Sequence, residues 1–188
     1  QGTDAHFAAV KQIADIKPFH PAVVENTVLK KPETIKGGHV ILQVGDESGV
    51  IDCAAYEPTK SFRKVVKDLI PGDLVRIYGG VKQHATTLNM EKLEVRRLTP
   101  KVVYENPLCP RCGSRMEAMG REQGYRCRKC GLRGQDMRKQ PVVLEREVQE
   151  GVYLPPPRAQ RHLTKPLQRY GQEKNGAKVF FIEKWHCP

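Results

Sequence analysis

Cys109-Pro-Arg-Cys112-Gly113 and Cys127-Arg-Lys-Cys130-Gly131 are two Cys-x-x-Cys pairs, each followed by a glycine, and fourteen residues lie between Cys112 and Cys127. Two thiolates at this spacing can converge on one tetrahedral ion, and the glycine after each pair permits the positive φ of a tight turn. The alternatives are disulfides or a chance arrangement, and a basic chain without a visible secretion signal disfavours disulfides. The spacing therefore predicts a structural zinc site with four sulfur ligands. The expected ligands are Cys109, Cys112, Cys127 and Cys130.

Positive charge gathers around the same segments. Residues 109–140 carry nine Lys/Arg and three acidic residues, a net charge of +6 out of +11 for the whole chain. A small zinc module has little core, so most of these side chains must be exposed, where they suit phosphate oxygens. A merely soluble basic surface is the alternative. We expect nucleic-acid binding through Arg111, Arg126, Arg128, Lys129, Arg133 and Arg138.

Length and composition limit the protein class. A chain of 188 residues with 39% hydrophobic content can hold one large domain or two small ones. It shows no apolar run near the ~20 residues of a membrane span, and no charged-then-apolar leader, which predicts a cytoplasmic protein. The chain begins with Gln1, so we expect a segment of a longer protein.

The first hundred residues show the pattern of a small barrel. Strands are expected at 23–30, 38–44, 50–56, 74–81 and 88–95, with an amphipathic helix at 59–69. Three strands, a helix and two strands follow the order of an OB-fold, a five-stranded Greek-key barrel. Gly79-Gly80 predicts a bulge or a corner. An SH3-like barrel or an incomplete sandwich is the alternative.

OB-folds commonly bind oligonucleotides on the face of strands two and three, which two loops flank. These loops are expected here near residues 31–36 and 83–86. Candidate contacts are Lys36, Lys82, His84 and Tyr56, although each also fits an ordinary solvated loop. Only 6% of the residues are aromatic, so the barrel offers few rings for stacking bases. We therefore expect it to grip the backbone and shape of a folded RNA or a duplex.

A proline-led basic stretch follows the second cysteine pair by some 25 residues. Pro155-Pro-Pro157 predicts an extended path, and basic residues then recur every three or four positions. They could lie along a nucleic acid, or the stretch could be a linker that packs on its neighbour. The candidate contacts are Arg158, Arg161, His162, Lys165 and Arg169. Further strands are expected at 141–150 and 178–182, and a short helical spacing at 7–16.

The sequence thus predicts a mainly β protein with a five-stranded OB-like barrel, a four-cysteine zinc ribbon and a basic C-terminal extension. We expect a junction from a preceding domain at 1–22, the OB-fold at 23–100, the zinc ribbon at 105–135 and the extension at 136–188.

These features together resemble a known family. The barrel, the two knuckles and the stretch Tyr153-Leu-Pro-Pro-Pro-Arg-Ala-Gln-Arg-His-Leu-Thr-Lys-Pro166 are similar to the C-terminal half of the archaeal tRNA(Ile) agmatinylcytidine synthetases. The opening Gln1-Gly-Thr-Asp-Ala-His6 looks like the junction after that enzyme's preceding domain. The proline-arginine-histidine stretch is the more telling part, since such knuckles occur in many families.

The resemblance implies an ATP-dependent ligase that joins agmatine to the wobble cytidine of an isoleucine tRNA. Its kinase-like catalytic domain, with ATP and magnesium, and its ferredoxin-like domain would precede Gln1, and this chain would anchor the tRNA. Asp4 could then pair with a cationic amine such as agmatine, and His6 could orient a neighbour. No catalytic residue is expected within the chain. The alternatives are a general single-stranded nucleic-acid-binding protein and a DNA-ligase-like portion.

Overall fold

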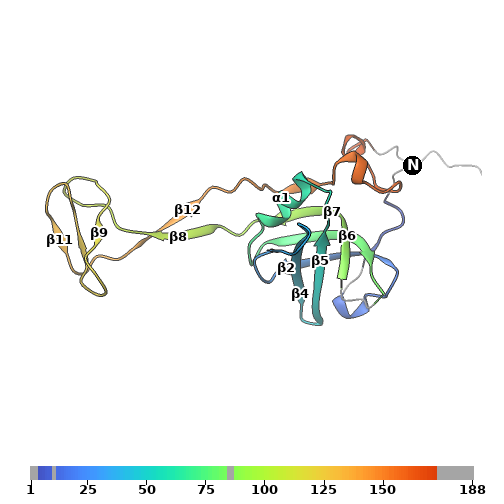
Figure 1. The fold of residues 1–188 in the computed structure, drawn as a ribbon, viewed down its shortest axis with the longest axis horizontal. Helices are drawn as coiled ribbons and strands as arrows, with labels where there is room; N and C mark the ends of the chain where they lie inside the picture. The colour runs from blue at the N-terminus through green and yellow to red at the C-terminus, as the bar shows by residue number, and fades with distance from the viewer. Residues whose placement is uncertain (1–3, 10–11, 84–86, 173–188) are drawn as a thin grey trace, which may run out of the picture.

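The computed structural model describes residues 4–9, 12–83 and 87–172 (Figure 1). A barrel stands at one end of an elongated molecule and the four-cysteine unit at the other (Figure 1). A two-stranded antiparallel ribbon of β8 (Lys101–Glu105) and β12 (Gln140–Leu144) joins them. The predicted mainly β architecture is confirmed.

Five strands close the barrel. They pair in the order β2-β6-β7-β5-β4, and β4 pairs again with β2. All of these pairings are antiparallel except β5–β7, which is parallel. The single α-helix of the described chain, α1 (Ser61–Lys67), lies between β5 and β6 in the sequence. The strand bounds are β2 (Pro21–Val28), β4 (Val40–Asp46), β5 (Gly49–Ala55), β6 (Leu74–Val81) and β7 (Thr87–Arg97). Both the OB topology and the predicted position of the helix are confirmed.

Alternating side chains fill the barrel. In β2, β4 and β6 every second residue is buried, as expected for strands with one face on a core. Helix α1 adds Phe62 and Val66, which are fully covered by the barrel. Burial of a side chain as large as Phe62 contributes about 1.5–3 kcal/mol. One contiguous core therefore holds the strands and the helix together.

The predicted irregularity at Gly79-Gly80 is a β-bulge. Tyr78 pairs with Lys92 but Gly79 pairs with Met90, so Glu91 is the extra residue of β7 at this point. A Cβ atom on Gly79 would lie 2.0 Å from the carbonyl oxygen of Asn89. Only glycine permits this close approach of the two strands.

Short elements complete the described chain. The four-cysteine unit contains a three-stranded antiparallel sheet in the order β11-β10-β9. Two-residue strands also extend the barrel sheet, and β13 pairs with β7. The bounds are β1 (Ala8–Ala9), β3 (Glu33–Thr34), β9 (Glu117–Ala118), β10 (Tyr125–Arg126), β11 (Arg133–Gly134) and β13 (Gly151–Tyr153). The 3₁₀ helices are η1 (Ile13–Asp15), η2 (Pro157–Ala159) and η3 (Leu167–Arg169).

Two expectations need correction. Among the described residues of 7–16, the expected helical spacing corresponds only to the short η1, and β1 pairs with β2 in the same segment. The strand expected at 141–150 ends at Leu144, because Arg146 and Val148 then turn in against the barrel. The strand expected at 178–182 lies outside the described residues. Within the described part of the chain, no helix is long and apolar enough to cross a membrane.

Candidate metal centre and nucleic-acid interface

The four predicted ligands meet at one point. The Sγ atoms of Cys109, Cys112, Cys127 and Cys130 all lie within 4.8 Å of one another. The two cross-knuckle pairs, Cys109–Cys130 and Cys112–Cys127, are 3.5 and 3.4 Å apart, which is too far for disulfides. Sulfurs about 2.3 Å from one tetrahedral ion would lie about 3.8 Å apart, so the cluster fits zinc.

Both knuckles use the same backbone hydrogen bonds. The Cys109 amide donates to the Ser114 carbonyl and the Gly113 amide donates to the Cys109 carbonyl, each at 2.8 Å. The second knuckle repeats this with Cys127, Leu132 and Gly131, at 2.8 and 2.9 Å. Gly113 and Gly131 adopt φ values of 70° and 76°, as the sequence predicted.

Polar groups beside the first knuckle favour a thiolate. Hydrogen bonds from the backbone and side chain of Ser114 lower the pKa of the Cys112 thiol to about 6. Hydrogen bonding from the Leu132 backbone lowers the pKa of the Cys130 thiol, but burial and the neighbouring thiols prevail and raise that pKa to about 11. Metal binding requires all four sulfurs to be deprotonated, so the fit to zinc rests on the convergence of the sulfurs and not on the pKa values.

All six basic candidates on this unit are exposed: Arg111, Arg126, Arg128, Lys129, Arg133 and Arg138. Arg128 is not a lone cation, because its Nε lies 2.6 Å from a carboxylate oxygen of Glu117 across the sheet. The pair is largely exposed, so its contribution to stability is small. It holds the Arg128 guanidinium against β9 and thereby orients it at the surface.

On the barrel, two of the four candidate side chains, Tyr56 and Lys82, lie close to each other. The His39 ring is edge-on to the Tyr56 ring at a centroid distance of 5.1 Å, and Lys82 Nζ lies 5.1 Å from the same centroid. His39 directly precedes β4 and Lys82 directly follows β6, so residues next to the two predicted loops, and not the loops themselves, contact this ring. Lys36 is exposed, and His84 lies outside the described residues.

A cavity of about 290 Å³ lies between the barrel and the extension. Tyr56, Asn89 and Glu91 line it from the barrel, and Arg158 and Arg161 from η2 and the residues after it. Its two arginines bring cationic groups to the side of Tyr56 that faces the extension. The barrel and the extension thus both contribute side chains to one hollow.

The extension follows the barrel rather than leaving it. Lys165 of the extension is half-buried, whereas its other basic candidates are exposed: Arg158, Arg161, His162 and Arg169. Arg161 Nε lies 3.2 Å from Glu91 Oε1. Burial raises the pKa of Glu91, although Arg161 and His6 partly offset this effect.

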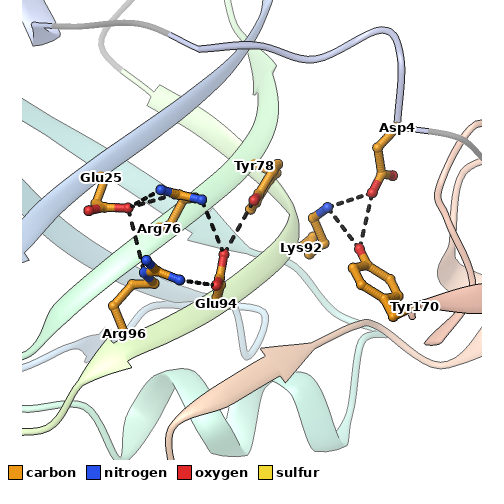
Figure 2. A network of polar contacts seen from close by, with 8 residues as sticks. All are labelled: Asp4, Glu25, Arg76, Tyr78, Lys92, Glu94, Arg96 and Tyr170. Carbon is orange, nitrogen blue, oxygen red and sulfur yellow. Dashed lines mark hydrogen bonds and ion pairs between the residues drawn. The ribbon is translucent and has the colours of Figure 1, made fainter. Parts of the chain in front are cut away.

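Asp4, expected as a partner of a cationic amine, holds a cation of the chain itself. Its Oδ2 lies 2.5 Å from Lys92 Nζ and accepts a 3.1 Å hydrogen bond from the Tyr170 hydroxyl (Figure 2). Burial opposes ionisation of Asp4, but the hydrogen bonds from Lys92 and Lys165 prevail and its pKa is lowered. The carboxylate is therefore charged at neutral pH, and the stabilisation is lost only as pH falls through the lowered pKa.

His6 lies beside a different carboxylate. Its Nε2 is 3.8 Å from Glu91 Oε2, and its ring packs on Phe7. Figure 2 also shows Glu25, Arg76, Glu94 and Arg96 joined by ion pairs on the outer face of the barrel. The charges of these four side chains are paired with one another, so we assign this part of the face a structural role and not a role in ligand binding.

Two family models match the chain. Residues 106–148 match the TiaS C-terminal zinc ribbon domain, and residues 23–97 match an OB-fold nucleic acid binding domain. The chain is also 45% identical over 170 residues to the 2-agmatinylcytidine synthetase TiaS of Methanosarcina mazei, covering 90% of this chain and 39% of that protein. The chain belongs to the TiaS family. It spans about two fifths of the length of the curated relatives it matches.

Other TiaS proteins agree with this assignment. The chain is 40% identical over 171 residues to TiaS of Archaeoglobus fulgidus, covering 91% of this chain and 40% of the relative. A crystal structure of apo TiaS superposes with a TM-score of 0.76 at 40% identity, over 89% of this chain and 39% of that one. A complex of TiaS with an isoleucine tRNA and ATP gives 0.71 at 38% identity, over 89% and 38%. The fold of the TiaS-family segment is therefore shared with solved relatives.

Sequence reasoning missed Glu91 and Lys92 of this family member. Both are charged, yet they are 9% and 4% exposed. The available signal was a pair of adjacent charges inside a strand that otherwise alternates, opposite a double glycine. Such a break in alternation indicates a bulge.

Proposed function

We propose that this chain is the tRNA-binding portion of an ATP-dependent ligase that joins agmatine to the wobble cytidine of an isoleucine tRNA. The observation that carries the proposal is the match to the TiaS zinc ribbon at residues 106–148, where the exposed arginines surround a fixed four-cysteine cluster. Relatives solved with an isoleucine tRNA, with ATP, and with AMPCPP and agmatine support it. ATP, magnesium and agmatine would be handled chiefly by the part of the enzyme that this chain does not span. Such a ligase would act in the cytoplasm.

Four cysteine thiolates would hold zinc as a structural ion, with Cys109 and Cys112 from one knuckle and Cys127 and Cys130 from the other. A four-sulfur shell leaves no open position, so the ion supplies rigidity and no chemistry. The knuckles then fix the directions of Arg111, Arg128 and Lys129, which lie within the Cys-x-x-Cys turns.

The shape of the molecule suits a long, folded ligand. The barrel and the metal unit are separated by the β8–β12 ribbon, so their basic surfaces can contact distant phosphates of one RNA (Figure 1). Contacts to phosphates fix the position of an RNA without reading its sequence. Binding energy gained in this way can offset the cost of unstacking a base elsewhere on the RNA.

We expect the 188-residue chain to prefer a folded isoleucine tRNA to an unstructured RNA of equal length and charge. Two rigid basic surfaces match a folded RNA, while few exposed rings are available to stack the bases of a flexible strand. Competition between the two RNAs in a fluorescence titration measures the preference at a fixed salt concentration.

The opposite result favours a general single-strand binder. The observation that supports this second function is the cluster of Tyr56, His39 and Lys82, where one ring could stack a base. Equal or tighter binding of the unstructured RNA, abolished in Tyr56→Ala, would replace the first proposal by the second.

The double variant Arg128→Ala/Lys129→Ala should weaken tRNA binding and reduce its dependence on salt. The plot of log K against log[salt] has a negative slope, and removal of one phosphate interaction reduces the magnitude of this slope by about 0.7–0.9. A titration of affinity across several salt concentrations gives the slope. The control is Lys64→Ala/Lys67→Ala on α1, which removes the same charge from the barrel. An equal decrease of slope in both variants would contradict a specific role for the second knuckle.

A further inference from the structure

The bulge in β7 turns two adjacent charged side chains to the same side. Leu88 and Met90 point into the barrel before it, and Leu93 and Val95 point in after it. The inward positions therefore change from even to odd numbers across the bulge. Glu91 and Lys92 are the two residues between them, so both side chains point outward.

Outward-facing charges are ordinarily solvated, but these two are covered. Glu91 is 9% exposed and Lys92 is 4% exposed, because two chain segments lie over them. One is the N-terminal segment, residues 4–7, and the other is the extension, residues 161–170. The Asp4 amide donates to the Leu163 carbonyl at 3.2 Å, so the two segments also meet each other.

Lys92 binds one group from each segment. Its Nζ lies 2.5 Å from Asp4 Oδ2 and donates to the Tyr170 hydroxyl at 2.9 Å (Figure 2). The ammonium also lies 3.6 Å from the centroid of the Tyr78 ring, a cation–π contact from the barrel. Asp4 Oδ1 accepts from the Lys165 amide at 2.9 Å and fixes the extension a second time.

Glu91 pairs with the extension and lies near the N-terminal segment. Its Oε1 lies 3.2 Å from Arg161 Nε of the extension, and its Oε2 lies 3.8 Å from His6 Nε2 of the N-terminal segment. The Arg161 side chain is 65% exposed despite this contact. The buried Glu91 carboxylate therefore holds Arg161 through its Nε atom, while the rest of the guanidinium remains accessible.

We propose that Glu91 and Lys92 are positioning residues for RNA binding: Glu91 aims Arg161 at the RNA, and Lys92 fixes the extension and the N-terminal segment at set places on the barrel. This inference rests on the proposed RNA-binding function. An arginine already held in one direction loses less rotamer freedom when a phosphate binds, so the affinity gains. The bulge, which supplies both charges at one point, couples the two segments.

A double-mutant cycle between Glu91 and Arg161 tests the link. Glu91→Ala should weaken binding of the folded isoleucine tRNA by about three- to tenfold, the effect of freeing one long side chain. The direction of this change in affinity is informative. Removal of a carboxylate near RNA reduces charge repulsion and would by itself strengthen binding, so weaker binding indicates that a positioned residue was lost. In the Arg161→Ala background, Glu91→Ala should have no further weakening effect, since the residue it positions is gone.

Amide hydrogen exchange provides a measurement that needs no RNA. Glu91→Ala and Lys92→Met should each accelerate exchange of amides in residues 157–172, while amides of β4 keep their protection. The control is Glu94→Ala, the next outward carboxylate of β7, which contacts Arg76 and Arg96 on the barrel. It should leave exchange in the extension unchanged and should not weaken RNA binding.

The two proposals fail in different ways. Additive effects in the cycle, or unchanged exchange in the extension, would overturn the positioning role even if the wild-type chain binds tRNA tightly. Faster exchange in the variants of a chain that shows no preference for folded tRNA would keep the attachment role of the bulge but overturn the proposed function.

Discussion

Cys112→Ser is expected to release the metal and unfold the four-cysteine unit, approximately residues 105–135, while the barrel stays folded. Metal binding in such a unit is largely its folding energy, with apparent values of about 10–16 kcal/mol for structural zinc. Metal content by mass spectrometry of the native protein, together with amide exchange across the chain, measures both effects. A variant that keeps one tightly bound zinc and its exchange protection would contradict the zinc-ribbon proposal.

The small size of the four-cysteine unit is the physical reason for this expectation. Its buried hydrophobic cluster contains only Met116 and two of the ligands, Cys109 and Cys127, among the described residues. Its strands β9, β10 and β11 are two residues long each. A sheet of this size with so little buried area is marginal in water without a further constraint.

Cys53→Ala provides the matched control. Cys53 is also a buried cysteine, but it lies in β5 within the barrel core, where burial raises the pKa of its thiol. The substitution should lower barrel stability by a modest amount and leave the metal content unchanged. Release of zinc in this variant would mean that metal content reports on global unfolding and not on the ligand removed.

The barrel was predictable because its signals are local. Alternation with period two marked the five strands, and apolar spacing of 3.6 marked α1, so the OB order followed from sequence alone. The four-cysteine cluster was predictable for a similar reason, since each knuckle is closed by hydrogen bonds within six residues, such as Cys109 to Ser114.

The remaining features depend on distant contacts. Gly151–Tyr153 forms a strand only because the edge of β7 beyond the β5 pairing is open to it. Asp4 meets Lys92 across 88 residues and Lys165 across 161 residues, which no local pattern encodes. Likewise, the strand expected over 141–150 stops at Leu144 because Arg146 finds its partner, Asp73, on the barrel.

Arg146→Ala is expected to destabilise the barrel by about 3–5 kcal/mol, the cost of leaving a buried charge without its partner. Asp73 is 0% exposed, and both of its oxygens lie 2.7 Å from the Arg146 guanidinium. The same guanidinium donates to the carbonyl oxygens of Asp68 and Thr99 at 2.7 and 3.0 Å. Chemical denaturation followed by circular dichroism measures the decrease, which is a large share of a typical total stability of about 5–15 kcal/mol.

A neighbouring, exposed ion pair provides the control for Arg146→Ala. Glu147 follows Arg146 directly and pairs with Lys64 at 2.5 Å, but both side chains are mostly exposed. Glu147→Ala should therefore have a much smaller effect on stability than Arg146→Ala, because solvent screens an exposed pair. If burial decides the difference, Arg146→Met combined with Asp73→Asn should recover part of the stability that Arg146→Ala removes, because no unpaired charge then remains inside.

The position of this pair gives the substitution a second consequence. Arg146 lies where the chain returns from the metal unit, and Asp73 stands at the start of β6, so the pair fixes the base of the β8–β12 ribbon to the barrel. At denaturant concentrations where Arg146→Ala remains folded, amides of residues 145–150 should exchange faster than in Glu147→Ala. Equal stability and equal exchange in the two variants would show that the ribbon is held by strand pairing alone and that the buried pair is dispensable.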